Sequence, residues 1–373
     1  MAGIYLHIPF CMSRCAYCDF FSTTQVGKRE IYVAALQKEL AMRTGYLPAG
    51  SLIDTVYFGG GTPSLLMEDD IRLLLQTIAD NYAVSPDAEI TLEANPGDLT
   101  APYLESLRSI CVNRLSIGIQ SFRDDLLRLI GRRHDAAMAW QSVKMAQACG
   151  FQNISIDLMY GLPTQTLSWW QDDLHSAIEL GVQHISTYCL TFEEKTQFGK
   201  MLAEGKLKET DEDLANKMYE TAVDQLAQAG FCHYEVSNFC LPDCQSWHNS
   251  AYWNNVPYLG IGAGAHSYDG SSRQWNIPDL DKYLSGVQAS SLPCEREVLS
   301  PTDLYNERVM LSLRTEHGLL LSGLSQKEKN YCLQQAENDL KRGLLVLTDD
   351  NRLVASLRGI EVLNRIIENL IIV

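Results

Sequence analysis

Short β-rich segments alternate with longer amphipathic segments through the first half of the sequence. The β-rich segments are GIYLHI from Gly3, DTVYFGG from Asp54, EITLEA from Glu89, RLSIGIQ from Arg114, NISIDLMYG from Asn153 and HISTYCLTF from His184. Helical patterns lie between them near residues 29–44, 67–82, 100–109, 135–149 and 167–180, and the last two are followed by the potential C-caps Gly150 and Gly181. Six successive βα units predict a parallel sheet covered by helices, either an open doubly wound sheet or a partial barrel.

Polar or glycine-rich groups stand at the ends of these β-rich segments. Three cysteines follow the first segment, GGGTP ends the second, and Glu93, Gln120 and Asp157 lie at the ends of the next three. Each group alone is also compatible with a turn or a helix entry. Five strand ends that agree favour the barrel, because the C-terminal ends of barrel strands ring one mouth, where sites collect. We therefore predict an α/β fold built on a partial (β/α)6 barrel of the TIM type.

The alternation stops after about residue 195. A helical pattern near 211–230 is followed by a loop rich in Cys, Trp, His and Asn at 232–257, and by the apolar run YLGIGAGAHSY, which either lines the barrel mouth or simply packs. From about Pro301 the order helix, helix, hairpin, helix resembles a winged helix. We predict three parts: a barrel over 1–195, a connecting region over 196–300, and a winged-helix-like α+β region over 301–373 that serves packing or partner docking.

Charge and hydropathy narrow the classes of partner. The formal net charge of −16 repels polyanions, so a nucleic acid is not expected as a partner. The first residues, MAGIYLHIPF, lack the features of a signal peptide, and charges interrupt every apolar run before the ~20 residues that a membrane span needs. The expected location is the cytoplasm, where the eleven cysteines are not expected to form a disulfide framework.

Three cysteines lie within eight residues in the segment CMSRCAYC, at Cys11, Cys15 and Cys18. Thiolates are soft ligands that select zinc, copper(I) or iron–sulfur clusters. A closed zinc site needs four ligands, yet the position two residues on is Phe20 rather than a fourth cysteine. Three thiolates on a cube of four irons leave one iron open to an exogenous ligand. A cluster that binds a small molecule is therefore the favoured interpretation, and a zinc or structural thiol site is the alternative.

The segment CMSRCAYC resembles the C-x3-C-x2-C signature of the radical S-adenosylmethionine (SAM) enzymes. This resemblance implies that Cys11, Cys15 and Cys18 hold a [4Fe–4S] cluster whose fourth iron is chelated by the amino and carboxylate groups of SAM. It also implies an electron donor, such as a flavodoxin or a ferredoxin, because these enzymes split SAM reductively into methionine and a 5′-deoxyadenosyl radical. The sequence leaves open whether this chain cleaves SAM productively, and we assign no catalytic residue.

The strand-end groups have the chemistry that SAM requires. Glycine backbone in GGGTP allows a methionine moiety to approach closely, carboxylates suit an ammonium or ribose hydroxyls, and amides or guanidinium groups suit a carboxylate. From residue 4 to about 193 the sequence resembles the oxygen-independent coproporphyrinogen III oxidase-like branch of the superfamily. That resemblance implies the following SAM-binding residues: Tyr5, Tyr17, Gly60, Gly61, Thr62, Glu93, Gln120, Arg132 and Asp157. Taken alone, Arg132 is equally interpretable as a surface residue and Tyr5 as a packing residue of a strand.

Two functions compete within this branch. One is the radical oxidative decarboxylation of coproporphyrinogen III in haem synthesis, and the other is that of the HemW family of haem chaperones, which bind haem and pass it to acceptor proteins. Oxidases of the branch have a fourth cysteine where Phe20 stands and a longer segment before the first cysteine, which lies here at position 11. The sequence therefore favours the chaperone, with the oxidase as the alternative.

The segment HNSAYW, from His248 to Trp253, resembles the H-N-x-x-Y-W haem motif of that family. Imidazole is a common axial ligand of haem iron, and flat aromatics such as Tyr252 and Trp253 offer a face to the macrocycle. The ordinary interpretation of the hexapeptide is a hydrogen-bonded loop histidine beside two core aromatics. The resemblance implies haem bound through His248, haem-accepting proteins as partners, and contact with a membrane only through those acceptors.

Overall fold

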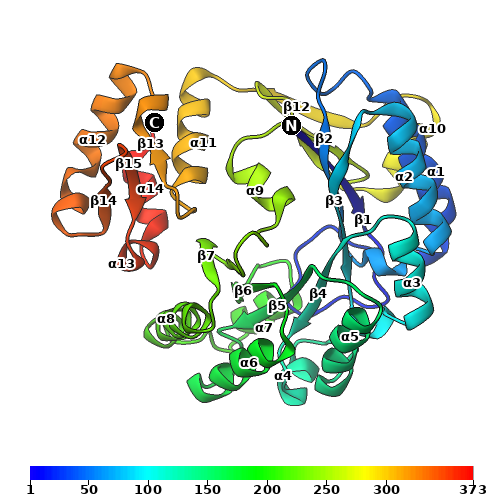
Figure 1. Cartoon of the computed structure of the whole chain (residues 1–373), viewed down its shortest axis with the longest axis horizontal. Helices are drawn as coiled ribbons and strands as arrows, with labels where there is room; N and C mark the ends of the chain where they lie inside the picture. The colour runs from blue at the N-terminus through cyan, green and yellow to red at the C-terminus, as the bar shows by residue number, and fades with distance from the viewer. Residues whose placement is uncertain (373) are drawn as a thin grey trace.

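Parallel strands form the centre of the computed structural model, which describes residues 1–372. They follow one another across the sheet in chain order, each paired in parallel with the next: β1 (Ala2–Ile8), β2 (Ile53–Gly60), β3 (Val84–Ala94), β4 (Arg114–Gln120), β5 (Ile154–Tyr160) and β6 (His184–Cys189). Each segment expected to be β contributes one of these strands. The sheet curves into a partial barrel with helices on its outer face (Figure 1), which confirms the predicted α/β fold.

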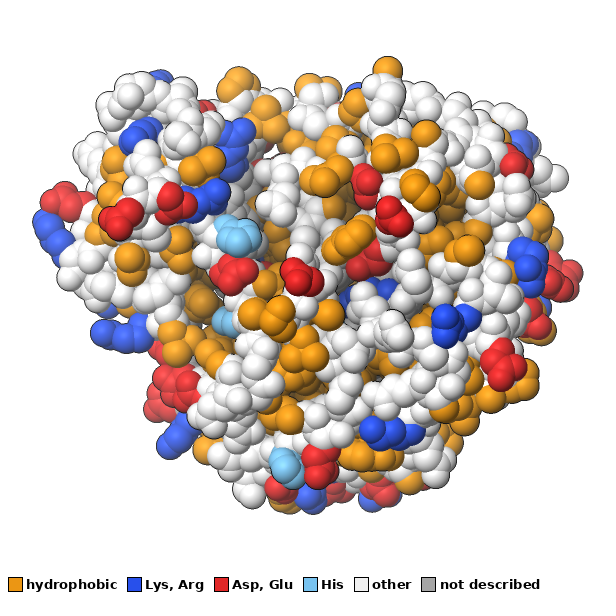
Figure 2. Space-filling view, in the orientation of Figure 1, with side chains coloured by type: hydrophobic (Ala, Val, Ile, Leu, Met, Phe, Trp, Pro, Cys, Tyr) orange, Lys and Arg blue, Asp and Glu red, His pale blue; other side chains and the backbone are white. Residues whose placement is uncertain are grey.

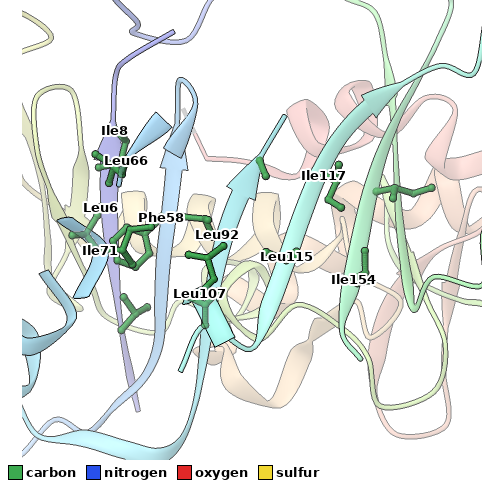
Figure 3. Close-up of a cluster of buried hydrophobic side chains, with 14 of the residues drawn as sticks. Leu6, Ile8, Phe58, Leu66, Ile71, Leu92, Leu107, Leu115, Ile117 and Ile154 are labelled. Atoms are coloured by element: carbon green, nitrogen blue, oxygen red, sulfur yellow. The ribbon is translucent and has the colours of Figure 1, made fainter. Parts of the chain in front are cut away.

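The outer face of the sheet carries the main hydrophobic core. Successive residues of a strand point to opposite faces, and Ile4, Leu6 and Ile8 of β1 are fully buried beneath the helices. Figure 3 shows how this layer continues across the neighbouring strands and helices through side chains that include Leu6, Ile8, Phe58, Leu66, Ile71, Leu92, Leu107, Leu115, Ile117 and Ile154. The alternate residues of the same strands point into the barrel and are largely polar. They therefore line an interior in which a ligand site can form.

Helices cover this core, and five of them begin and end close to the expected residues, whereas the short helix Asp124–Leu129 was not expected. They are α1 (Arg29–Met42), α2 (Glu68–Asn81), α3 (Ala101–Ser109), α4 (Asp124–Leu129), α5 (Ala136–Ala148) and α6 (Leu167–Leu180). Thr100, Asp135 and Thr166 cap the N-termini of α3, α5 and α6, because each side chain accepts a hydrogen bond from a backbone N–H in the first turn. Gly181 ends α6 in the left-handed region with φ of 69°, as a C-cap glycine does.

Strands from the second half of the chain extend both edges of the parallel sheet. β9 (Tyr258–Ile261) pairs in parallel with β1, and β10 (His266–Tyr268), β11 (Ser272–Asn276) and β12 (Cys294–Val298) continue that edge in antiparallel pairs. β8 (Asn238–Cys240) and β7 (Cys232–Glu235) extend the other edge beyond β6. The main core includes residues from Ala2 to Val287, so the predicted barrel and connecting region share one core, and their boundary at residue 195 stays a prediction.

The region expected as a loop at 232–257 is more ordered than its sequence indicated, and that expectation is wrong. It contains β7, β8 and the short helix α9 (Trp247–Trp253), while α7 (Gln197–Ala203), α8 (Glu212–Gln228) and α10 (Leu280–Gln288) lie on either side in the sequence. Strands of three or four residues and a helix of seven are too short to produce a periodic pattern. α9 contacts β1 and β2 and occupies the central opening enclosed by the sheet (Figure 1).

The C-terminal region forms a separate unit with its own core. It contains α11 (Pro301–Ser312), β13 (Leu319–Leu320), α12 (Gln326–Lys341), β14 (Leu345–Leu347), β15 (Arg352–Ala355), α13 (Leu357–Ile360) and α14 (Leu363–Leu370). β15 pairs with both β13 and β14 in a three-stranded sheet, so the expected order of helix, helix, hairpin and helix is present. The second core includes Tyr305, Val309, Leu353 and Ile366 and contains no residue of the main core.

Helix composition and the charges on one face bear on the membrane and polyanion expectations. Among residues 1–372, every helix is too short or too polar to cross a bilayer. Figure 2 shows acidic and basic side chains interspersed over the face in view, rather than a block of basic side chains. Nucleic-acid binding requires a concentration of Lys and Arg, so this face does not suit it.

Candidate functional site

The loop after β1 brings the three predicted cluster ligands to one cavity. Cys11, Cys15 and Cys18 are partly buried and all line this thiol cavity, at the C-terminal ends of the parallel strands. The Thr62 hydroxyl donates to Cys11 Sγ at 3.5 Å, and the Arg132 guanidinium donates to Cys15 Sγ at 3.6 Å. These donors favour thiolates, although burial raises the pKa of the Cys11 and Cys18 thiols.

The predicted SAM residues converge on the same cavity. Its lining includes every one of them except Tyr5, namely Tyr17, Gly60, Gly61, Thr62, Glu93, Gln120, Arg132 and Asp157. They come from the ends of β2, β3 and β4, from loops beside these strands, and from β5, where Asp157 lies in the middle of the strand rather than at the end that its sequence indicated. The barrel therefore gathers in space groups that are up to 140 positions apart in the sequence, as Tyr17 and Asp157 are, because parallel strands end at one mouth.

Glu93 is the buried acid of this cavity. Tyr57 donates its hydroxyl to Glu93 Oε1 at 2.8 Å, and the Gly60 N–H donates to Oε2 at 3.1 Å. Burial outweighs these donors and raises the pKa of Glu93 to about 7. Burial also raises the pKa of Asp157. Burial disfavours the ionised form of both acids. A ligand that carries a positive charge or several hydroxyls would therefore stabilise their carboxylates.

Arg132 is not the surface residue that its local sequence also allowed. Its guanidinium donates to Asn95 Oδ1 and to the carbonyl oxygen of Gly118, in addition to Cys15 Sγ. Its Nε is buried and has no hydrogen-bond partner among residues 1–372. A buried donor without a partner is costly, so the site has an unfilled requirement for an acceptor, which the carboxylate of a ligand would meet.

Backbone geometry explains three of the predicted residues. Gly60 has φ of 113°, and a Cβ there would lie 2.6 Å from the His7 imidazole. A Cβ on Gly61 would lie 2.8 Å from the backbone of Pro9 and Phe10. The glycines are therefore required for close packing of the GGGTP turn against the cysteine loop, before any ligand is considered. Gln120, at the end of β4, has φ of 71°, a strained conformation that directs it into the cavity lining.

Tyr5 and His248 lie away from the thiol cavity, inside the barrel. Tyr5 stacks on Tyr57 with ring centroids 6.1 Å apart, and its hydroxyl lies 3.1 Å from His7 Nδ1. His248 packs against Tyr57 at 4.9 Å between ring centroids. A Cβ on Gly3 would approach the His248 ring to 3.2 Å, so the lack of a side chain at this position of β1 makes room for the imidazole.

Both ring nitrogens of His248 are engaged. Nδ1 lies 2.7 Å from Thr55 Oγ1, and Nε2 lies 2.8 Å from the Tyr252 hydroxyl. The side chain is 1% exposed, and burial, followed by the charge of Arg114, lowers its pKa to about 3, so the ring is neutral. Coordination of iron by His248 would require it to release one of these partners.

The HNSAYW segment contributes to the lining of two further cavities. Tyr252 lines a cavity of about 560 Å³, which we call the aromatic cavity and which also borders β1, the cysteine loop and β9 to β11. Trp253 lines a second cavity of about 460 Å³ beside Cys232 and His317. Phe20, at the position where a fourth cysteine is missing, lines both the thiol cavity and the aromatic cavity. The cluster loop and the haem motif therefore border one common cavity.

Comparisons with known proteins identify the family. A model described as the radical SAM superfamily matches residues 5–177. The haem chaperone HemW of Lactococcus lactis subsp. lactis (strain IL1403) is 37% identical over 374 residues, which cover 99% of this chain and 97% of that protein. The chain belongs to the radical SAM superfamily. Membership of this superfamily implies a [4Fe–4S] cluster and SAM as cofactors.

Other radical SAM relatives define the branch. HemW of Bacillus subtilis (strain 168) is 36% identical over 88% of this chain and 87% of its own length. The mitochondrial radical S-adenosyl methionine domain-containing protein 1 of Danio rerio is 33% identical over 100% of this chain and 87% of its own. Coproporphyrinogen III oxidase (HemN) from Escherichia coli, a radical SAM enzyme, is similar in structure with a TM-score of 0.85 at 25% identity, covering 99% of this chain and 89% of that one. The predicted HemN-like, HemW-related branch is confirmed.

The radical SAM cofactors suit the thiol cavity. Among residues 1–372, no three His, Cys, Asp or Glu side chains converge as ligands of a single metal ion. A cube of four irons presents a separate iron to each thiolate, so it accepts thiols that are spread around a cavity. The free Nε of Arg132 and the buried acid Glu93 offer complementary partners to the carboxylate and the ammonium or hydroxyl groups of SAM. The residues present therefore fit both groups.

Sequence reasoning missed several residues that shape the site. Tyr57 donates to Glu93, Asn95 accepts from Arg132, and His7 packs over Gly60. Strand alternation contained part of the signal, since Tyr57 stands two residues before Gly59 and so shares its face. The contact between Asn95 and Arg132 joins segments 37 residues apart and left no pattern in the sequence.

Proposed function

We propose that the chain is a haem chaperone that carries a [4Fe–4S] cluster and SAM, binds haem and passes it to acceptor proteins. The carrying observation is that the three cysteines and all SAM-binding candidates but Tyr5 line one cavity, and that Phe20 lines both this cavity and one lined by Tyr252 of the HNSAYW segment. Identity of 36–37% to HemW proteins over most of the chain supports the same function. An electron donor such as a flavodoxin or ferredoxin is part of the proposal, because the cluster must be reduced.

Each group of the thiol cavity has a proposed task. Cys11, Cys15 and Cys18 hold the cluster, which when bound supplies one iron without a protein ligand and one-electron redox chemistry. Arg132 directs its free Nε at an acceptor on the ligand, and Glu93 and Asp157 accept hydrogen bonds from the donors of the ligand. Thr62 and Arg132 stabilise thiolates by donating to Cys11 and Cys15. The sequence motif assigns His248 to the haem site, either as an iron ligand or through the contacts that its engaged ring nitrogens make.

The cluster assignment is tested by removal of one ligand. We expect anaerobically reconstituted Cys15→Ala to lose the broad visible absorption of an iron–sulfur cluster, because two thiolates do not hold a cube of four irons. Cys294→Ala is the matched control, since Cys294 is exposed on β12 and does not line the thiol cavity. A full complement of iron and sulfide in Cys15→Ala would rule out the assignment.

The alternative function is coproporphyrinogen III oxidase, and the structural similarity to HemN favours it. The two functions are separated by incubating the reconstituted chain with coproporphyrinogen III, SAM and a reductant, and by offering the haem-loaded chain to an apo-haem protein in parallel. We expect no decarboxylated product and a transfer of haem. Formation of decarboxylated product would establish the oxidase, and haem binding without transfer would contradict the chaperone.

A further inference from the structure

The aromatic cavity has the shape and lining of a site for a flat conjugated ligand. Its volume of about 560 Å³ lies within the ~300–1,000 Å³ of typical small-molecule sites. Aromatic side chains come to it from β1, the cysteine loop, α9, β9, β10 and β11, namely Tyr5, Phe21, Tyr252, Tyr258, Tyr268 and Trp275. Such rings offer apolar faces to a macrocycle and hydroxyls or an indole N–H to its polar edge.

Three histidines lie in or beside this cavity, and two of them are already engaged. His7 is 5% exposed, with Nδ1 at 3.1 Å from the Tyr5 hydroxyl and Nε2 at 2.8 Å from the carbonyl oxygen of Phe21. His248 is 1% exposed, does not line the cavity, and has both nitrogens bonded to Thr55 and Tyr252. Neither imidazole has a free nitrogen to offer to a metal.

His266 differs from the other two. It is exposed on β10, lines the aromatic cavity and stacks on Trp275 with ring centroids 6.0 Å apart and an interplanar angle of 24°. Its ring nitrogens have no hydrogen-bond partner among residues 1–372, so either is free to bind iron. Desolvation lowers the pKa of His266 below that of a free histidine, which favours the neutral imidazole that metal coordination requires.

We propose that haem binds in the aromatic cavity with the imidazole of His266 as an axial ligand of its iron, and that His248 is a positioning residue. This assignment rests on the proposed haem-carrying function. It gives the HNSAYW motif a different role from the one that its sequence predicted, because the motif then contributes the wall residue Tyr252 rather than the metal ligand.

The contacts of His248 explain how it would act through Tyr252. Thr55 on β2 fixes Nδ1, and Nε2 holds the hydroxyl of Tyr252, so a hydrogen-bonded chain runs from the barrel wall to the cavity wall. The rings of His248 and Tyr252 also pack edge to face, 4.8 Å apart. Loss of His248 would let the Tyr252 ring turn out of the cavity wall, which weakens haem binding without removing the iron ligand.

Spectroscopy of haem complexes tests the assignment. Ferric haem is titrated into the cluster-reconstituted full chain and into His266→Ala, His266→Cys, His248→Gln and His175→Ala, the last an exposed histidine far from the cavity lining. We expect His266→Ala to lose the imidazole-ligated absorption and electron paramagnetic resonance signature, and added imidazole to restore it. His266→Cys should acquire a thiolate-ligated signature. His248→Gln should keep the imidazole signature and bind about tenfold or more weakly.

The outcomes separate this inference from the proposed function. A wild-type chain that binds no haem overturns both. A wild-type chain that binds haem while His266→Ala and His266→Cys leave its spectrum unchanged overturns the ligand assignment and leaves the chaperone function standing. Loss of the imidazole signature in His248→Gln alone returns the ligand role to His248. If the wild type shows a thiolate signature and Cys232→Ala lacks it, haem binds in the cavity beside Trp253, and the His266 assignment is overturned.

Discussion

Histidines of one barrel differ in function because their hydrogen bonds differ. His7 and His248 are buried with both ring nitrogens bonded, so they orient neighbouring groups, whereas the His266 ring faces a cavity without a partner. A sequence motif identifies a histidine but contains no information on which nitrogens are already engaged. The haem motif therefore indicated the segment that borders the aromatic cavity, while the hydrogen bonds of its histidine became visible only in the structure.

The affinity for SAM should depend on pH through Glu93. The pKa of this buried acid is raised to about 7, so it is largely protonated in the ligand-free chain below that pH. SAM donors prefer the carboxylate, so binding below pH 7 must release the proton and weakens by up to about tenfold for each pH unit. We expect affinity measured by calorimetry on the cluster-loaded chain to rise from pH 5 to pH 7 and then to level off.

The matched variant for this dependence is Glu93→Gln. It keeps an acceptor oxygen but cannot ionise, so we expect weaker binding with a flatter pH profile. Asp157, whose pKa is also raised by burial, adds a dependence of the same sign, and Asp157→Asn should remove that part alone. Identical pH profiles in wild type and Glu93→Gln would show that Glu93 does not meet the ligand as a carboxylate.

Local residue identity predicted the thiol cavity well, because its parts lie at strand ends that the βα pattern fixes in sequence. Tyr5 is the exception among the predicted SAM residues, since it points into the barrel and lines the aromatic cavity instead. Its position in β1 did not reveal this, because Asp157 stands at the same fourth position of a seven-residue strand and does line the thiol cavity. The contacts of Tyr57 and Asn95 were not predictable, because they depend on which inward-facing side chains meet across strands.

At the scale of elements, the long helices and strands were predictable and the short ones were not. α1, α2 and α6 have fourteen residues each, enough for several turns of periodic burial. α9 has seven residues and is stabilised from outside its own sequence. Its Ser246 N-cap accepts from the Asn249 N–H, while the Glu89 carboxylate of β3 accepts from the N–H groups of Trp247 and His248 at 3.1 Å each.

Glu89 should therefore be a strong determinant of stability and of α9 position. Glu89→Ala removes the acceptor of two helix N–H groups and leaves Arg114, which is 1% exposed with its Nε 3.9 Å from Glu89, without that carboxylate in the barrel interior. We expect the free energy of unfolding to fall by about 3–5 kcal/mol, as when one partner of a buried ion pair is removed. Urea unfolding measures the loss.

Asp87→Ala is the control for Glu89→Ala, because Asp87 is exposed on the same strand. Its effect should stay within about 0.5 kcal/mol. Haem affinity should fall in Glu89→Ala and not in Asp87→Ala, since Tyr252 is carried by α9. A change of less than about 1 kcal/mol in Glu89→Ala would mean that α9 does not depend on this anchor.

At the scale of the whole molecule, backbone hydrogen bonds form a seam between the barrel and the C-terminal unit, beside side-chain contacts such as the Arg273–Glu307 ion pair. The Val236 N–H donates to the carbonyl oxygen of Arg314 at 2.9 Å, and the Glu316 N–H donates to that of Tyr234 at 3.1 Å. Glu235 lies at this seam, where its backbone forms an isolated antiparallel β-bridge with that of Thr315. The sequence predicted a C-terminal unit from its change of pattern near Pro301, but the residues that form this seam lie in and directly after β7, within a segment expected to be a loop.

Glu235 should make the attachment of the C-terminal unit sensitive to pH. Burial raises its pKa from 4.5 to about 7 despite hydrogen bonds from Asn238 and the Ser237 N–H. At Glu235 the folded state therefore binds more protons than the unfolded state between these values, so the contribution of this residue to stability is greatest below pH 4.5 and is lost as pH rises through 7. At about 1.4 kcal/mol per pKa unit, the loss reaches about 3 kcal/mol by pH 8.

Glu235→Gln should abolish this loss, because the amide keeps an acceptor at the seam and never ionises. Hydrogen exchange of α11 to α14, compared between wild type and variant at the same pH, isolates the effect from the intrinsic pH dependence of exchange. We expect the two proteins to exchange alike at pH 5 and the wild type to exchange faster at pH 8. Glu212→Gln, at an exposed position on α8, should behave as wild type throughout. Because the second core shares no residue with the main core, faster exchange confined to α11 to α14 would show that the unit loosens at the seam, whereas equal protection at both pH values would show that Glu235 ionises without cost.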